Sequence, residues 1–251
     1  MNVDIWAEAG AGAPVAALEG ELLRLVESQE QVATNRLVDT LEEQALLESL
    51  LEAAKPALPK AADGLHYLLA TPFRYPPLRH GSRFGGRFEP SLFYAALTTP
   101  TVLAESAYYR LVFWHGMAVP PSSPLMTQHT LFGARWRCAR GLRLQLEPFD
   151  RWRDALVDPA DYRATQQLGS GMRAAGIEAF EYVSARDPAG GLNVALFTPA
   201  ALATRRPTFM QAWLAETGAS GVRFYSAEER ALQRFPLEQF LVAGRLPTPA
   251  I

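Results

Sequence analysis

The chain has 251 residues, of which 49% are hydrophobic and 20% are charged, and its formal net charge is −2. This composition is that of a globular protein and excludes a mostly disordered chain. The slight acidic excess provides no general positive field for nucleic acid, so we expect no direct nucleic-acid partner.

The N-terminal residues lack the basic start of a secretory signal. No apolar run is long enough to span a membrane. We therefore expect a cytoplasmic protein without a membrane partner. Cys138 is the single cysteine, which excludes an intramolecular disulfide, and we interpret it as a structural thiol.

Two helices are predicted in the first sixty residues. Apolar residues recur at helical spacing from Ala16 to Ser28, and a second set, rich in Leu and Glu, runs from Leu37 to Leu51. Lys55-Pro56 ends the second helix. We predict an N-terminal helical extension over residues 1–60, followed by a main domain over residues 61–251. Such helices can cover their own chain or a partner, which leaves a homo-oligomer open.

The next segment is rich in aromatic residues, Gly, Pro and Arg. Three prolines predict that residues 71–77 are not helical. Leu92 to Leu97 is a short apolar run typical of a buried strand. A helix is predicted from Thr98 to about Trp114, with Pro100 in its first turn.

Strand and helix signals then alternate. Arg135 to Leu146 is predicted to be a strand. Asp158-Pro159 is typical of a helix start, so we predict a helix from Ala160 to about Ala175. Gly176 is placed to end it.

The C-terminal third completes the predicted fold. Glu178 to Ser184 and Leu192 to Phe197 indicate two strands joined by a tight turn. A last helix is predicted near Ala227–Arg234. Together these elements predict an α+β protein, in which a small mixed or antiparallel sheet is flanked by helices.

Common catalytic motifs are absent from the sequence. It contains no P-loop, no HExxH and no CxxC. The four histidines have no i,i+4 pairing, so we expect no metal site. Lys55 and Lys60 are the only lysines, so a phosphate site elsewhere would have to use Arg or backbone amides.

A group of Arg, Tyr and Glu residues remains as a candidate site. Arg binds phosphate oxygens bidentately, Tyr offers a stacking face, and Glu can hold a ribose or stabilise positive charge on a sugar. The pattern indicates an anionic ligand with an aromatic ring. The alternative is that the Arg and Glu residues form structural ion pairs and Tyr94 belongs to the core. The group comprises Arg74, Tyr75, Arg83, Arg87, Tyr94 and Glu105.

Short motifs in this region resemble the RES-domain family, which is named for its Arg, Glu and Ser. Arg87-Phe88, Tyr94-Ala95-Ala96 and Ala104-Glu105 follow the family's order, and eleven residues separate Tyr94 from Glu105. Downstream, Val183 to Arg186 and Asn193 to Phe197 resemble the family's Ser strand and its return.

The resemblance implies a core fold like that of ADP-ribosyltransferases of the diphtheria-toxin type, with NAD as the substrate. It also implies a toxin whose active site is blocked by an Xre-like helical antitoxin. The bond broken would join nicotinamide to ribose. The acceptor stays open between water or phosphate, as in a glycohydrolase or phosphorylase, and a protein side chain, as in an ADP-ribosyltransferase. A non-catalytic NAD-binding scaffold is a further alternative.

The resemblance also assigns roles to residues. Glu105 would stabilise the oxocarbenium-like transition state or hold ribose hydroxyls. Tyr94 would pack on nicotinamide or its ribose, and Ser184 would bind that ribose or orient Glu105. Tyr109 would line the pocket, while Tyr75 and Arg186 are weaker candidates.

The arginine that would hold the pyrophosphate is less sharply defined. The resemblance favours Arg87. However, the family commonly has Asn after this Arg-aromatic pair, whereas this chain has Glu89. Arg83 or Arg74 can therefore share or take the role of Arg87.

Overall fold

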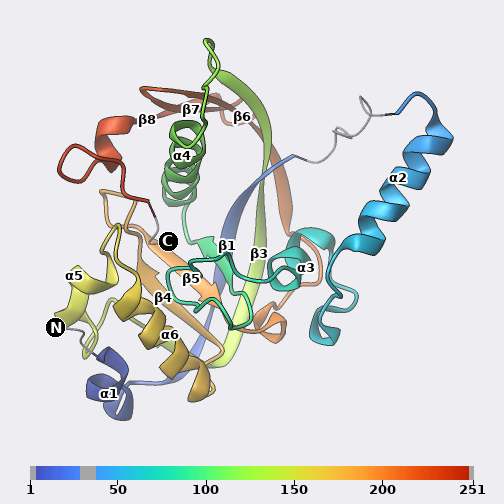
Figure 1. Ribbon diagram of the computed structural model, residues 1–251. Coiled ribbons are helices and arrows are strands. Elements are labelled where there is room, and N and C mark those ends of the chain that lie inside the picture. The colour runs from blue at the N-terminus through green and yellow to red at the C-terminus, as the bar shows by residue number, and fades with distance from the viewer. Residues whose placement is uncertain (1–3, 29–37, 249–251) are drawn as a thin grey trace.

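A computed structural model describes residues 4–28 and 38–248, which form an α+β fold around one mixed sheet (Figure 1). This confirms the predicted fold class. The strands are β1 (Ala16–Glu27), β2 (Phe93–Ala96), β3 (Leu125–Arg143), β4 (Ala179–Val183), β5 (Leu192–Leu196), β6 (Phe209–Gly218), β7 (Gly221–Ser226) and β8 (Ala231–Pro236). The α-helices are α1 (Ile5–Ala9), α2 (Leu41–Ala54), α3 (Tyr67–Arg74), α4 (Thr99–His115), α5 (Arg153–Leu156) and α6 (Arg163–Ala174).

The sheet closes on itself through its first strand. The strand order is β1-β2-β5-β4-β3-β6-β7-β8, and β1 pairs with β3 as well as with β2. Five strands therefore form a ring of pairings, and β6, β7 and β8 extend from β3. The pairing of β3 with β4 is parallel, whereas β1–β2, β1–β3 and β4–β5 are antiparallel.

Three buried clusters attach every α-helix except α2 to this sheet. The first joins α1 and α6 to β4 and β5. In the second, Leu69 and Phe73 of α3 pack with Phe93 and Trp136. The third joins α4 to β6 and β7, as Figure 1 also shows. Apolar burial on this scale fixes the position of α4, which carries Glu105.

The helix predicted at Ala16–Ser28 is wrong, because these residues form strand β1. Leu18 and Leu22 are buried as expected. However, a spacing of four also places two side chains on the same face of a strand, so it does not distinguish the two structures. These residues form a strand because their backbone pairs with β3 from Leu18 to Glu27.

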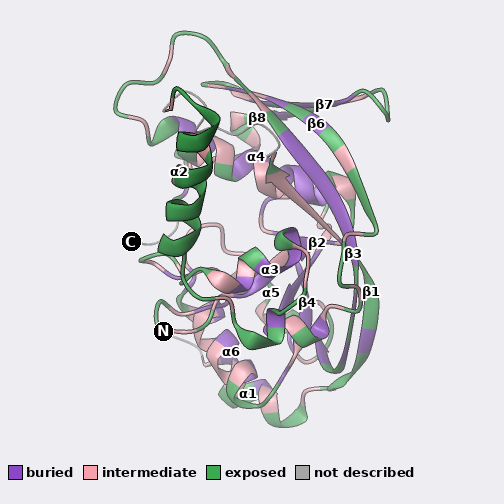
Figure 2. Ribbon diagram, turned by 90° about the vertical axis from the view of Figure 1, so that its right-hand side faces the viewer, coloured by how far each residue is buried: buried purple, intermediate pink, exposed green. Residues whose placement is uncertain are grey.

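The second N-terminal helix is confirmed as α2, which has Thr40 as its N-cap and ends before Lys55. Figure 2 shows that it is exposed along its length, and none of its residues is buried. Leu37, the predicted start, lies outside the described residues. Because β1 belongs to the main sheet, the first 60 residues are not helical throughout. The domain division at residue 60 stays a prediction.

Pro72 lies inside α3, so the expectation that no part of residues 71–77 is helical is wrong for 71–74. The helix is short, and its buried face, which includes Leu69 and Phe73, packs on the sheet. This packing outweighs the backbone hydrogen bond that Pro72 cannot donate.

The C-terminal prediction is also wrong, because β7 and β8 form a hairpin where a helix was expected near Ala227–Arg234. Residues 222–226 alternate between buried and exposed, which is the period of a strand. By contrast, β2, α4 and the antiparallel pair β4–β5 confirm the corresponding predictions. The strand predicted from Arg135 to Leu146 is confirmed as far as Arg143, but β3 begins earlier, at Leu125.

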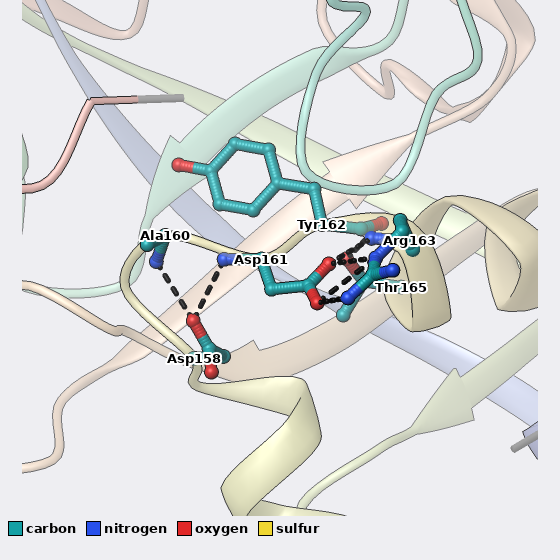
Figure 3. Close-up of polar contacts among 6 residues, drawn as sticks. All are labelled: Asp158, Ala160, Asp161, Tyr162, Arg163 and Thr165. Atoms are coloured by element: carbon teal, nitrogen blue, oxygen red, sulfur yellow. Dashed lines mark hydrogen bonds and ion pairs between the residues drawn. The ribbon is translucent and has the colours of Figure 1, made fainter. Parts of the chain in front are cut away.

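Helix α6 begins three residues later than predicted. Asp158 Oδ1 accepts hydrogen bonds from the backbone amides of Ala160 and Asp161, so it caps a turn that precedes the helix (Figure 3). The Asp161 carboxylate forms an ion pair with Arg163. This turn presents the ring of Tyr162 away from α6 (Figure 3).

None of the described helices is long and apolar enough to cross a membrane.

Gly169 permits close contact between α6 and the loop of residues 81–85. A Cβ atom at this position would lie 1.8 Å from the carbonyl oxygen of Phe84. We predict that Gly169→Ala lowers the free energy of unfolding by about 1–3 kcal/mol, because the loop must move away from the helix. Chemical denaturation measures this loss. Gly12→Ala is the control, since nothing lies within 4 Å of its added Cβ. Equal stability of the two variants would contradict the prediction.

Candidate functional site

The described residues enclose a cleft of about 570 Å³ between α4, β2, the end of α3 and the turn after β4. This volume is within the usual range for a small-molecule site. Five tyrosines supply aromatic faces, namely Tyr75, Tyr94, Tyr109, Tyr162 and Tyr182. The charged lining residues are Arg24, Arg83, Glu105 and Arg186.

Glu105 is held at the cleft by two hydrogen bonds to the same oxygen. Its Oε1 accepts one from the hydroxyl of Ser184 at 2.6 Å and one from Nδ2 of Asn193 at 2.7 Å. Both donors come from the β4–β5 hairpin, whereas Glu105 comes from α4. The predicted association of Glu105 with Ser184 is therefore present in the structure.

The proton of the Ser184 hydroxyl has a defined direction. Its Oγ accepts hydrogen bonds from the backbone amides of Arg186 at 3.0 Å and Asp187 at 3.1 Å. Because these donors occupy the oxygen lone pairs, the O–H is left to point at Glu105. Ser184 thus orients the carboxylate, which is one of its two expected roles.

The turn that carries Ser184 is fixed to the start of α4. The Thr101 hydroxyl donates a hydrogen bond to Asp187 Oδ2 at 2.8 Å. Gly191 permits this approach, because a Cβ there would lie 2.0 Å from Thr101 Oγ1. This contact fixes the position of α4 relative to the β4–β5 hairpin, and it lies one helical turn before Glu105.

Arg83 is buried at the cleft and forms no ion pair with a carboxylate of the described residues. Its Nη1 donates hydrogen bonds to the backbone carbonyls of Leu156 and Asp158, at 3.3 and 2.8 Å. The guanidinium carbon lies 4.5 Å from the centre of the Tyr162 ring. Arg83 is thus held by neutral groups, which leaves its charge uncompensated.

Tyr94 holds the loop that carries Arg83. Its hydroxyl shares a hydrogen bond with Ser82 Oγ at 2.8 Å and accepts one from the Phe84 amide at 3.0 Å. Burial raises the pKa of the Tyr94 hydroxyl to about 12. Tyr94 lines the cleft and also positions the two neighbours of Arg83. Its contact with nicotinamide or ribose stays a prediction.

Arg186 is a second buried arginine of the cleft. Its guanidinium carbon lies 3.4 Å from the centre of the Tyr108 ring. Its Nη2 donates to the Pro159 carbonyl at 2.7 Å and to the Tyr162 hydroxyl at 3.0 Å. The turn that follows Asp158 thus brings Tyr162 to both arginines, with its ring against Arg83 and its hydroxyl against Arg186.

Arg24 enters the cleft from β1. Its Nη1 donates a hydrogen bond to the Tyr94 carbonyl at 2.6 Å, while its Nε is buried and has no partner among the described residues. Burial lowers the pKa of Arg24 to about 10, so it remains cationic at neutral pH.

The cleft therefore has an excess of two positive charges. Arg24, Arg83 and Arg186 face one carboxylate, Glu105. Within the described part of the chain, none of the three arginines forms an ion pair. Such an arrangement is suited to an anion, because buried charges require a counter-charge.

The structure places two of the predicted arginines outside the cleft. Arg87 is exposed, lies beside the ring of Phe88 and does not line the cleft. Arg74 forms an ion pair with Glu52 and donates to the Pro56 carbonyl, also outside the cleft. Arg83, the third candidate, is the one that lines it. Tyr75 and Tyr109 line it as expected.

Sequence analysis missed several lining residues. Arg24 was placed on a predicted helix, although a lone arginine in the apolar run of residues 22–26 was a usable signal. Asn193 similarly interrupts an apolar strand. Tyr162 and Tyr182 had no distinctive sequence context.

A metal-free site stays a prediction. Among the residues that the structure describes, no three His, Cys, Asp or Glu side chains are grouped to hold a metal ion.

The family assignment follows from the comparison with known families. The model of the RES domain matches residues 57–217. The chain belongs to the RES-domain family. This confirms the resemblance found in the sequence, and it shows that β1, with Arg24, precedes the matched segment. No curated protein matches the chain.

One solved structure with a similar fold is the MbcT–MbcA toxin–antitoxin complex of M. tuberculosis. The matched chain is 10% identical over 86% of this chain and 93% of its own length, with a TM-score of 0.46.

The raised pKa of Tyr94 predicts a pH-dependent effect of Tyr94→Phe. At pH 8 the variant lacks the two hydrogen bonds of the Tyr94 hydroxyl. Its free energy of unfolding should therefore be about 1–2 kcal/mol lower than that of the wild type. Above pH 10 the unfolded chain releases this proton before the folded protein does, so the wild type loses stability towards pH 12. At pH 11 the difference between the proteins should shrink by about 1.4 kcal/mol. Denaturant unfolding at both pH values measures it, and an unchanged difference would contradict the assigned pKa.

Proposed function

We propose that this protein is an enzyme that cleaves NAD and releases nicotinamide, acting as a glycohydrolase or a phosphorylase. The observation that carries the proposal is a fixed glutamate, Glu105, beside buried arginines that lack counter-ions in the described residues. Family membership supports the same conclusion, since the resemblance to RES-domain toxins implies NAD as substrate.

The charges of the cleft suit a dinucleotide. A pyrophosphate carries two negative charges, which would balance the excess of two positive charges. Arg24, Arg83 and Arg186 would hold it through charge-assisted hydrogen bonds. The tyrosine rings would pack against nicotinamide and ribose.

The reaction needs little acid catalysis at the leaving group. When the bond between ribose C1′ and nicotinamide N1 breaks, its electron pair stays on the nitrogen and neutralises the pyridinium. Positive charge develops on the ribose, and a carboxylate close to it stabilises that charge. Glu105, held by Ser184 and Asn193, would supply this carboxylate, and water or phosphate would then attack C1′.

The central test is Glu105→Gln. We expect the turnover of NAD to fall by at least about a hundredfold, because a neutral amide cannot stabilise the developing positive charge. Turnover is measured by chromatography of nicotinamide release. Glu216→Gln on β6, outside the cleft, is the control and should retain activity. A folded Glu105→Gln protein with wild-type turnover would refute the proposal.

The same assay identifies the acceptor when it is run with and without phosphate. ADP-ribose indicates water, and ADP-ribose 1-phosphate indicates phosphate. Nicotinamide release that requires added protein, with label transferred from isotopically labelled NAD, would instead indicate a protein ADP-ribosyltransferase. Binding without product would indicate a non-catalytic scaffold.

The arginine assignment predicts different effects for two neighbouring arginines of one loop. Arg83→Ala should raise KM for NAD by about tenfold or more, because a charge-assisted contact to phosphate is lost. Arg87→Ala should leave KM within about twofold, since that side chain is exposed outside the cleft. Steady-state kinetics of the two variants provides the comparison. The reverse order of effects would return the role to Arg87.

The resemblance further leads us to propose a cytoplasmic toxin with an Xre-like helical antitoxin as partner. The proposal predicts that expression of the chain alone lowers cellular NAD and that co-expression of the antitoxin prevents the loss.

A further inference from the structure

We propose that Tyr108 is a positioning residue of the cleft: its ring holds the guanidinium of Arg186 in the orientation that binds the anion. Arg186 is one of the three arginines that line the cleft, whereas Tyr108 lies behind it and is not part of the lining. The inference rests on the proposed function and adds to it a residue that acts through Arg186.

Arg186 has one nitrogen that the protein holds and two that it leaves free. Its Nη2 donates hydrogen bonds to the Pro159 carbonyl and the Tyr162 hydroxyl. Within the described residues, Nε and Nη1 donate no hydrogen bond, yet both atoms retain accessible surface. Because Arg186 lines the cleft, these two nitrogens are available for charge-assisted hydrogen bonds to an anion.

An aromatic ring lies against the face of this guanidinium. Cζ of Arg186 lies over the ring of Tyr108, 3.4 Å from its centre. A planar cation is attracted to the face of an aromatic ring, and the ring carries no net charge that would neutralise it. The contact therefore limits the tilt of the guanidinium and leaves its positive charge available to a ligand.

The ring of Tyr108 is itself fixed by the C-terminal part of the chain, which returns to α4 after β8 (Figure 1). Tyr108 is fully buried, and its hydroxyl donates a hydrogen bond to the Pro247 carbonyl at 2.6 Å. The ring of Phe240 packs 6.2 Å from it, centre to centre. Gln239 Nε2 donates to the backbone carbonyl of Arg186 at 3.4 Å. These C-terminal residues follow the segment that matches the RES domain, which ends at residue 217.

Tyr108 has a different part in the site from Glu105, although both lie on α4 and are separated by one helical turn. The carboxylate of Glu105 is held by Ser184 and Asn193, and neither contact involves Tyr108. Loss of the ring should therefore weaken anion binding without removing the group that acts on the ribose. A residue that only fills the core would have no such link to Arg186.

The test is a double-mutant cycle of Tyr108→Leu and Arg186→Ala, with the dissociation constant of ADP-ribose measured by calorimetry. We expect Tyr108→Leu to raise this constant by about tenfold in the wild type and by less than about twofold in Arg186→Ala, because the ring acts through Arg186. Tyr108→Phe keeps the ring and should bind within about threefold of the wild type. With NAD, Tyr108→Leu should raise KM by about the same factor and leave kcat within about twofold.

Tyr225→Leu is the matched control. Tyr225 lies on β7, is 43% exposed and does not line the cleft, so its replacement should leave the dissociation constant unchanged. If Tyr108→Leu does not fold, Tyr108→Met is the second variant, because its flexible side chain fills the space without an aromatic face. Equal factors in the two backgrounds, or a Tyr108→Phe protein as weak as Tyr108→Leu, would show a core role only and overturn the inference.

The proposed function and this inference fail in different ways. If the folded wild type releases no nicotinamide from NAD, the proposed function fails. The cycle is measured on the binding of ADP-ribose, which requires no cleavage, so the expected coupling between Tyr108 and Arg186 supports the inference in either case. Absence of ADP-ribose binding to the wild type overturns it.

Discussion

The pair of hydrogen bonds that converges on Glu105 Oε1 is the interaction on which the site depends. It joins α4 to the β4–β5 hairpin, two parts of the chain about eighty residues apart in sequence. Each bond has a charged acceptor and is therefore worth about 1.5–3 kcal/mol. The Thr101–Asp187 contact and the close approach at Gly191 hold the same two elements in register. The carboxylate is consequently positioned before any ligand arrives, which is the condition for effective electrostatic stabilisation.

The surrounding arginines lower the stability of the fold but give the cleft its capacity to bind an anion. Arg83 and Arg186 are buried against carbonyls, hydroxyls and aromatic rings, and within the described residues neither forms an ion pair with a carboxylate. Burial of unpaired charge opposes folding. A protein that retains this arrangement sacrifices stability for the capacity to bind an anion. Neutral hydrogen bonds hold each guanidinium in place without cancelling its charge.

The elements that sequence analysis predicted correctly are those whose start, end or turn is determined by neighbouring residues. Helix α4 has a capping threonine and an early proline, and the β4–β5 pair has a tight turn. Strand β1 could not be predicted, because its spacing fits a helix as well and its partner β3 lies about a hundred residues away. The choice between Arg83 and Arg87 also could not be made from local sequence. Arg-Phe occurs twice in residues 83–88, and only tertiary burial distinguishes Phe84, fully buried, from Phe88, which is 91% exposed.

The position of β1 in the sheet has a consequence for the newly made protein. Arg24 is synthesised before β3, so its strand can complete its pairing only after β3 has been made. Ser184 and Asn193 follow later still. A nascent chain therefore lacks the assembled cleft until at least Asn193 has emerged. Until then, Arg24, Glu105 and Asn193 cannot act on one ligand together, because strands that come late in the chain bring them to the same cleft.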